Sequence, residues 1–305
     1  MSRQLWFDFA AGSDRGPVRE RNEDAAYAGA RVLALADGVG GHPGGDLASA
    51  AMVRGFAQID FTLEGWDGTD HLRAAAFRGE DAIAEQVALR PELDGMATTL
   101  TAVLLQRDHR VVLLHAGDSR GYLFRDRRLY QLSKDDTFVQ SLVDAGALSP
   151  DEARFHPQRN IVLRALSGRG TRFSLASWTV RPGDLLLLCS DGLSDALSDD
   201  VIAEVMSSSS HTEECAERLI GQALSRGARD NVTCIVAHVV EGPPHIEPVF
   251  VGAALSGEPK LDRGLTHPVK KRDRRHAAMR DQPGLRGTFS AVVGSRGGST
   301  GLVNE

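Results

Sequence analysis

Cysteine is scarce in this chain, and the three that occur lie far apart. Cys189, Cys215 and Cys234 include no Cys-x-x-Cys pair, so the sequence indicates neither a disulfide framework nor a zinc site. Long apolar runs are missing too, because none approaches the roughly 20 residues that a membrane-spanning helix needs. The N-terminus lacks the basic-then-apolar order of a secretory signal, and we therefore expect a cytoplasmic protein without a membrane span.

Positive charge is in short supply over the first 240 residues. The chain of 305 residues has a formal net charge of −6, but residues 241–305 carry ten Lys or Arg against seven Asp or Glu, which leaves −9 for residues 1–240. An acidic body is a poor surface for nucleic acid, so we expect no nucleic-acid partner. The same charge is compatible with a protein that collects cations.

Short apolar runs alternate with longer helical patterns from about residue 5 to residue 240. The periodicity predicts helices over 46–60, 70–90 and 199–226, and strands over 5–11, 32–36, 99–106, 110–116, 122–125, 129–132, 173–180, 184–190 and 231–240. Runs of strands with helices between them favour antiparallel sheets covered by helices over a strict βαβ alternation.

The composition changes after Val240. Residues 241–305 are rich in Gly, Pro and Arg and have little periodicity, which is typical of a disordered or loosely packed tail. The basic run KKRDRR at 270–275 could bind an acidic partner or membrane lipid, although a solvated charge run is the plainer interpretation. We therefore expect one domain at 1–240 and a tail at 241–305.

Four aspartates stand at the ends of apolar runs. Asp37 ends VLALAD, Asp191 follows LLLLCS, Asp118 follows VVLLHAG, and Asp230 precedes NVTCIVAHV. An Asp-Gly pair alone is typical of a tight turn, but a glycine-rich loop and a helix follow Asp37, and a helix start follows Asp191. Carboxylates that converge repel one another unless a cation neutralises them, and Mg²⁺ and Mn²⁺ prefer oxygen ligands. The pattern therefore predicts a divalent-metal site.

Six motifs follow one another along residues 5–240: SDRGPVRERNEDAAY, LADGVGGH, MATTLTAVLL, HAGDSRGYL, CSDGLSD and ARDNVT. In this order they resemble the metal-dependent Ser/Thr protein phosphatases, the PPM or type-2C family, in its bacterial branch. The resemblance implies an α+β fold, a four-layer α-β-β-α sandwich of two antiparallel sheets flanked by helix pairs. It also implies that metal-activated water hydrolyses phosphoserine and phosphothreonine in phosphoprotein substrates, in opposition to a bacterial Ser/Thr kinase. We expect a monomer.

The resemblance also implies a role for individual residues around two Mn²⁺ or Mg²⁺ ions. Asp37 would bridge the ions with the Gly38 carbonyl on one of them, Asp191 and Asp230 would hold the other, Asp118 and Asp195 would bind a third and weaker ion, Glu23 and Asp24 would support the site, and Arg19 would grip the phosphate. His42 is the nearest candidate for a general acid, and a loop histidine without a catalytic role is an equal interpretation.

Some of these positions have a plainer interpretation. Asp118 could close a turn or pair with Arg120, Arg19 could be an ordinary surface arginine, and Glu23 could pair with Arg19 or Arg21.

The sequence also leaves a second function open. A catalytically weak phosphatase-like module could act as a regulator or scaffold through its basic tail. A cysteine phosphatase is excluded, because Cys189 has Asp195 where the Cys-x5-Arg signature requires arginine.

Overall fold

Two antiparallel sheets occupy the middle of the structure, a computed structural model that describes residues 4–41, 43–62, 68–242 and 247–255. All of these residues belong to the unit Met1–Leu265. Within them, the first sheet has the strand order β1 (Leu5–Asp14), β10 (Val232–Glu241), β9 (Leu185–Cys189), β6 (Arg120–Arg125) and β7 (Arg128–Gln131). The second has the order β11 (Val249–Gly252), β2 (Asp24–Ala28), β3 (Val32–Asp37), β4 (Leu100–Leu105), β5 (Arg110–Ala116) and β8 (Ser174–Thr179).

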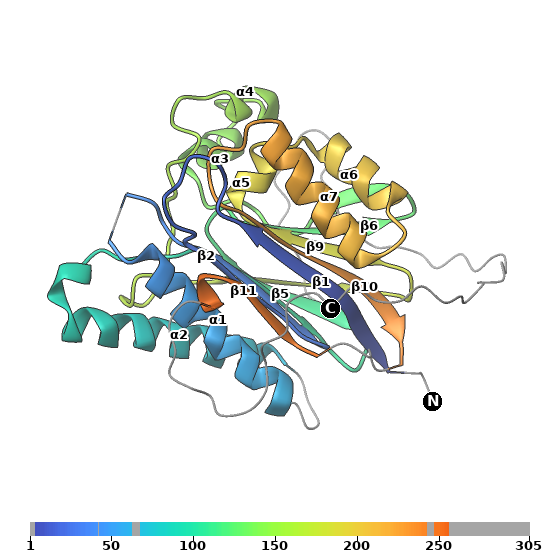
Figure 1. Cartoon of the computed structure of the whole chain (residues 1–305), viewed down its shortest axis with the longest axis horizontal. Helices are drawn as coiled ribbons and strands as arrows, with labels where there is room; N and C mark the ends of the chain where they lie inside the picture. Colours follow the sequence, from blue (N-terminus) through green and yellow to red (C-terminus); the bar gives the residue numbers. More distant parts are fainter. Residues whose placement is uncertain (1–3, 42, 63–67, 243–246, 256–305) are drawn as a thin grey trace, which may run out of the picture. The chain divides into compact units, whose positions relative to one another are not determined.

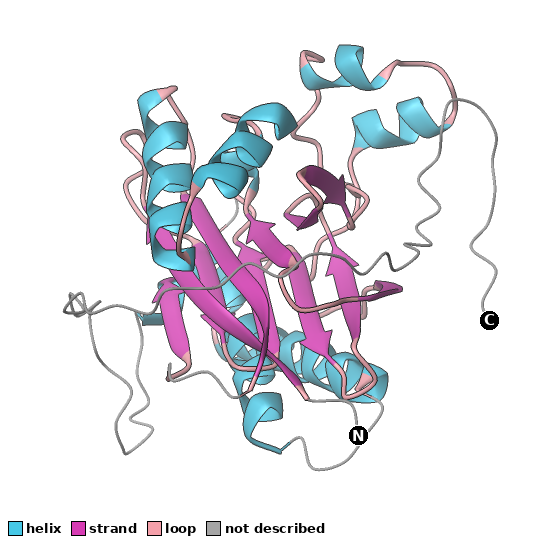
Figure 2. Ribbon diagram, turned by 90° about the vertical axis from the view of Figure 1, so that its right-hand side faces the viewer, coloured by secondary structure: helices cyan, strands magenta, loops and turns pink. Residues whose placement is uncertain are grey.

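A pair of long helices covers the outer face of each sheet. Helices α1 (Gly45–Thr62) and α2 (Thr69–Leu89) pack on the second sheet, with Met52, Phe56 and Ile83 in one buried cluster with its strands. Helices α6 (Asp199–Ser208) and α7 (Thr212–Ser225) pack on the first sheet through Ile202 and Leu219. Figure 2 shows the strands between helices on both outer sides. The predicted α+β, four-layer α-β-β-α sandwich is confirmed.

Two of the predicted boundaries need correction. The pattern over 199–226 predicts one helix, but α6 ends at Ser208 and α7 begins at Thr212. The side chains of Ser208 and Ser209 bond back to the carbonyls of Glu204 and Val205 at 2.7 and 2.8 Å. Such local bonds compete with the helical ladder and help to end a helix.

The second correction concerns the tail. Residues 249–252 form β11, which pairs with β2, and Ala253–Leu255 form the short helix η2, so the prediction of a loose tail from residue 241 is wrong for this stretch. Phe250 contacts Tyr27 with ring centroids 5.0 Å apart. Residues 243–246 and 256–305 of the predicted tail lie outside the described residues.

Four shorter helices complete the described part of the chain: η1 (Pro91–Leu93), α3 (Phe138–Asp144), α4 (Pro150–Arg154) and α5 (Asp191–Ser194). Helices α3 and α4 lie in the excursion between β7 and β8 and were not predicted. Thr137 caps α3, and Ser149 with Glu152 forms a capping box at α4. No helix of the described residues combines the length and the apolar character needed to cross a bilayer.

A buried ion pair joins β6 to the turn before β9. Arg125 donates from Nε to Asp184 at 2.7 Å and from a terminal nitrogen to its other oxygen, while the side chains are only 7% and 1% exposed. The Arg181 backbone N–H also donates to Asp184, at 2.8 Å. The Asp184 carboxylate therefore organises this turn with every bond inside the protein.

Candidate active site

The strand register brings distant aspartates to one edge of the sandwich. In the second sheet, Asp24 at the start of β2 lies opposite Asp37 at the end of β3. The end of β5, just before Asp118, pairs with the start of β4. In the first sheet, the end of β9, just before Asp191, pairs with β10 close to its start after Asp230. Because each pair is antiparallel, all of these positions belong to the same end of the strands.

The backbone of Asp37 is held on both sides. Its N–H donates to the Thr99 hydroxyl at 3.0 Å, and its carbonyl accepts from the Thr99 N–H at 2.8 Å and from the Thr98 hydroxyl at 2.8 Å. At Gly38, a Cβ would lie 2.6 Å from the Gly45 backbone, so only glycine fits there. The MATTL motif therefore fixes the strand end that carries Asp37.

Asp24 is a buried hub between the two sheets. Its carboxylate accepts from the Ser190 hydroxyl at 2.8 Å, and Asp24 lies opposite Asp37 in the pairing of β2 with β3. Burial raises the pKa of Asp24 to about 6. This carboxyl thus ties the start of β2, which pairs with the end of β3, to the residue that precedes Asp191.

Glu23 directly precedes β2, and its side chain lies against the start of α1. Its N–H donates to the Asn231 side chain at 2.8 Å, and its carbonyl accepts from the Ser49 hydroxyl at 2.6 Å. Burial, followed by the nearby Asp46, raises the pKa of its carboxyl. A Cβ on Gly45 would lie 3.2 Å from the Glu23 carboxyl carbon, so the first residue of α1 packs directly against this side chain.

Asp191 and Asp230 come together because α5 packs on the turn before β10. A Cβ on Gly192 would lie 2.0 Å from the Asn231 carbonyl oxygen, so this contact requires glycine. Burial, then Asp118 and Asp230, raises the pKa of Asp191. For Asp37, burial is again the largest cause of a raised pKa, followed by Asp24 and Asp191.

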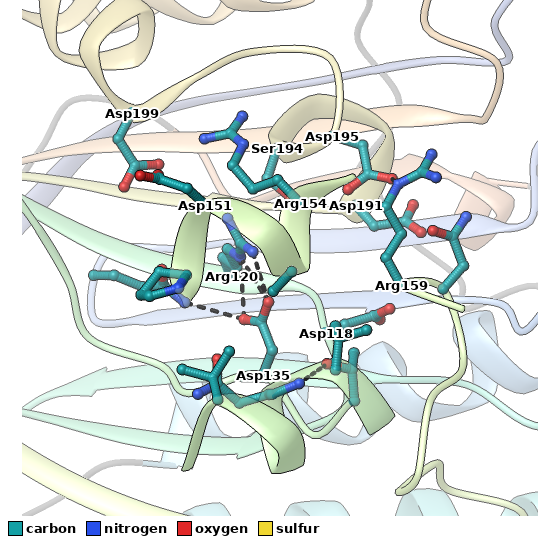
Figure 3. A pocket seen from close by; sticks show the side chains of 18 residues that line it. Asp118, Arg120, Asp135, Asp151, Arg154, Arg159, Asp191, Ser194, Asp195 and Asp199 are labelled. Atoms are coloured by element: carbon teal, nitrogen blue, oxygen red, sulfur yellow. Dashed lines mark hydrogen bonds and ion pairs between the residues drawn. The ribbon is translucent and has the colours of Figure 1, made fainter. Parts of the chain in front are cut away.

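Asp118 and Asp195 line a cavity of about 360 Å³ beside this cluster, together with Asp191 (Figure 3). Asp118 is 9% exposed, and burial, then Asp135, raises its pKa to about 7. Asp195 is 3.5 Å from Arg159. The alternative that Asp118 pairs with Arg120 is not what the structure shows, because Arg120 binds Asp135 instead.

The position of Arg19 agrees with a place in the site but adds a partner that the sequence does not predict. Its terminal nitrogen donates to Asp230 at 2.6 Å, which also raises the pKa of the guanidinium. This ion pair with Asp230 differs from both alternatives, an ordinary surface arginine and a pair with Glu23.

His42 lies outside the described residues, so its role as a general acid stays a prediction.

The donor chemistry of the cluster suits a hard divalent cation. Burial and then neighbouring aspartates raise the pKa of Asp37 and of Asp191, so a cation would stabilise their charged form, and Mg²⁺ and Mn²⁺ bind carboxylate oxygen. Among the residues that the structure describes, however, no three His, Cys, Asp or Glu side chains are already placed to hold one metal ion. The ligand set therefore remains a prediction that rests on donor type and proximity.

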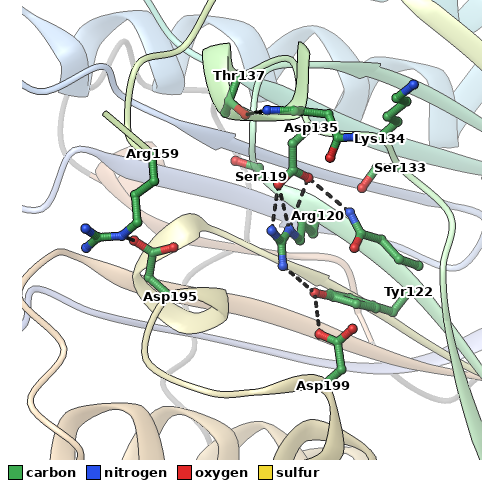
Figure 4. Close-up of polar contacts among 12 residues, drawn as sticks. Ser119, Arg120, Tyr122, Ser133, Lys134, Asp135, Thr137, Arg159, Asp195 and Asp199 are labelled. Atoms are coloured by element: carbon green, nitrogen blue, oxygen red, sulfur yellow. Dashed lines mark hydrogen bonds and ion pairs between the residues drawn. The ribbon is translucent and has the colours of Figure 1, made fainter. Parts of the chain in front are cut away.

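Sequence reasoning missed a polar network on the far side of the cavity. Arg120 donates to Asp135 Oδ1 at 3.0 Å and to Asp135 Oδ2 at 2.7 Å. It also donates to the Tyr122 hydroxyl at 3.2 Å, which in turn donates to Asp199 at 3.3 Å (Figure 4). The residues in the sequence that could have indicated this network are Arg120 in the GDSR motif and the two adjacent aspartates of LSKDDT. Arg154 of α4 lines the same cavity.

Comparisons with known proteins agree with this geometry. Residues 17–225 match the family model described as Protein phosphatase 2C. The chain is 49% identical over 254 residues to "Serine/threonine protein phosphatase PstP" of Mycobacterium tuberculosis, covering 83% of this chain and 49% of the relative. It is 34% identical over 241 residues to "Serine/threonine phosphatase stp" of Listeria welshimeri, covering 73% of this chain and 92% of the relative.

A solved structure gives the same picture. The catalytic domain of serine/threonine protein phosphatase PstP in complex with 2 manganese ions superposes with a TM-score of 0.73 at 49% identity, covering 78% of this chain and 100% of that one. This chain spans about half the length of the M. tuberculosis relative.

Proposed function

The chain belongs to the protein phosphatase 2C family, and we propose that it hydrolyses phosphoserine and phosphothreonine in proteins with two Mn²⁺ or Mg²⁺ ions. The family match confirms the predicted resemblance, and the relatives from M. tuberculosis and L. welshimeri are named as Ser/Thr phosphatases. The PstP catalytic domain holds 2 manganese ions, and the carboxylates here are ligands of the kind that such ions prefer.

One observation carries the proposal. The buried carboxyls of Asp24 and Asp118 and the half-buried carboxyls of Asp37 and Asp191 converge at one end of the strands, where Asp24 and Asp118 raise the pKa of both Asp37 and Asp191. Arg19 reaches the same place through Asp230. Clustered carboxylates next to a guanidinium can bind cations and a phosphate dianion side by side.

The residue roles are part of the proposal. Asp37, Asp191 and Asp230, with the Gly38 carbonyl, would hold the two ions, and Asp118 with Asp195 would hold a third, weaker one. When bound, the ions supply Lewis-acid polarisation of the phosphoryl group and acidify a water. Arg19 binds and orients the phosphate, and the hydrogen bonds of Asp24 and Glu23 hold the surrounding strands in register. His42 is kept as the candidate general acid.

The wider setting is also proposed, on the family analogy. We place the protein in the cytoplasm as a monomer that opposes a Ser/Thr kinase. We keep a division into a phosphatase domain and a Gly/Pro/Arg-rich tail, and we move its boundary from residue 240 to residue 255 because β11 and η2 pack with the second sheet.

Metal removal is the direct test of this function. We expect the full chain to hydrolyse a phosphothreonine peptide and p-nitrophenyl phosphate with Mn²⁺ or Mg²⁺, to lose both activities in EDTA, and to regain them when metal is added back. The reason is that the carboxylate cluster, which needs a cation to act, is the catalytic apparatus of the described residues. Phosphate release would be measured at matched protein concentration.

The same assay separates the proposal from the rival function. A regulatory or scaffold module would bind a phosphoprotein but release no phosphate with any metal. Undiminished turnover after metal stripping would contradict the metal-dependent mechanism itself.

A further inference from the structure

We infer that Gly252 is a positioning residue for the carboxylate site, acting through the backbone of Asp24. The inference rests on the proposed function, because it concerns the metal affinity of that site. It assigns a catalytic consequence to β11, a strand that follows the last predicted motif.

Strand β11 is anchored firmly against the second sheet. It pairs with β2 over four residues, with Gly252 opposite Ala25. Phe250 packs on Tyr27. The two residues after Gly252, Ala253 and Ala254, are 2% and 9% exposed and belong to the core cluster under α1. Arg54 of α1 donates to the Ala254 carbonyl at 3.4 Å. The position of Gly252 is therefore fixed from both sides.

The contact that matters is between Gly252 and Asp24. Gly252 has φ +66°, and a Cβ built there would lie 2.1 Å from the Asp24 carbonyl oxygen and 3.1 Å from the Ser13 hydroxyl. Carbon and oxygen cannot approach to 2.1 Å without bonding, so any side chain at 252 must push the Asp24 backbone away or expel β11. Gly252 thus sets how closely β11 approaches the first residue of β2.

Movement of Asp24 would reach the proposed metal ligands. Its carboxylate, 1% exposed, accepts from the Ser190 hydroxyl at 2.8 Å, one residue before Asp191, and Asp24 lies opposite Asp37 in the pairing of β2 with β3. Groups that hold metal ligands in place, without binding the metal themselves, change metal affinity when they are removed. Displacing Asp24 should therefore weaken metal binding without removing any ligand.

The chain offers a matched control at Gly242. This glycine also has a left-handed backbone, φ +89°, but a Cβ there would meet no atom within 4 Å. Gly242→Ala and Gly252→Ala therefore introduce the same methyl group and the same kind of backbone strain. They differ in the collision with Asp24.

The experiment uses the full chain carrying each substitution. Mn²⁺ affinity is measured by calorimetric titration, thermal unfolding by circular dichroism, and turnover with p-nitrophenyl phosphate at Mn²⁺ concentrations from well below to above saturation. We expect Gly252→Ala to weaken Mn²⁺ binding by about tenfold or more, with a parallel loss of turnover below saturation. Gly242→Ala should lower the melting temperature but leave Mn²⁺ affinity at the wild-type value.

Equal Mn²⁺ affinity in the two variants would overturn the inference, because a purely structural role moves only the melting temperature. If Gly252→Ala fails to fold, Phe250→Ala provides the second test, since it loosens β11 from Tyr27 and adds no atom near Asp24. Weakened Mn²⁺ binding in that variant supports the inference, and wild-type affinity with a detached β11 refutes it. A wild-type chain that binds no Mn²⁺ would instead reject the proposed function.

Discussion

Asp191→Asn should lower phosphate-ester hydrolysis by about a thousandfold or more, because losing several kcal/mol of charge stabilisation has that effect on a rate. Asp191 begins α5 among Asp118 and Asp230, and its neutralisation removes a charged ligand from the proposed core of the site. Saturating Mn²⁺ should not restore the rate, because an amide is a weaker ligand than a carboxylate at the same place. Phosphate release at increasing Mn²⁺ concentration measures the effect.

Asp118→Asn should behave differently. Asp118 lies at the cavity on the side of Asp195, where we place the weaker ion. Its variant should still bind two Mn²⁺ ions by calorimetry, and its loss of rate should be smaller or reversible with added metal. Asp94→Asn, at an exposed carboxylate paired with Arg169, serves as the control and should match the wild type. Wild-type affinity and rate in Asp191→Asn would show that this aspartate is not a core ligand.

Asp184→Asn should destabilise the fold by about 3–5 kcal/mol without changing the turnover of the molecules that remain folded. The carboxylate is 1% exposed and accepts from Arg125 and from the Arg181 N–H. An amide in its place leaves the buried guanidinium of Arg125 without a counter-charge and turns one acceptor into a donor that faces other donors. Urea unfolding at neutral pH gives the change in free energy.

Asp126→Asn is the matched control for this effect. Asp126 also binds Arg181, at 2.6 Å, but its side chain is 71% exposed. We expect a change of about 1 kcal/mol or less, since exposed ion pairs contribute little. Similar losses in both variants would mean that burial does not set the strength of the Arg125–Asp184 pair.

The parts of the fold that the sequence predicts well are those with strong local patterns. The run LLLLC of β9 and the run VLALA of β3 are buried throughout, and each is too short to be taken for a helix. Since these strands end in Asp191 and Asp37, their convergence could also be expected. Strand β2 was missed because DAAYA has no β-branched residue and only one aromatic residue.

Other parts depend on contacts that no local pattern reveals. Strand β11 lies in a Gly/Pro-rich context, and only its pairing with β2 makes VFVG a strand. Arg19 and Asp230 are 211 positions apart, so their ion pair could not be read from spacing. In contrast, the Ser149-x-x-Glu152 spacing is a local sequence pattern that predicts the start of α4, because it forms a capping box.

The pairing of β11 with β2 also has a consequence for self-association. Strand β2 is buried along all five residues, and without β11 its backbone N–H and C=O groups would form an open, apolar sheet edge. Such edges recruit strands from other molecules and lead to aggregation, whereas a four-residue edge strand followed by the short helix η2 presents little to pair with. A chain cut before residue 247 would therefore expose the unpaired edge of β2, and we expect the stretch 249–255 to limit self-association of the protein.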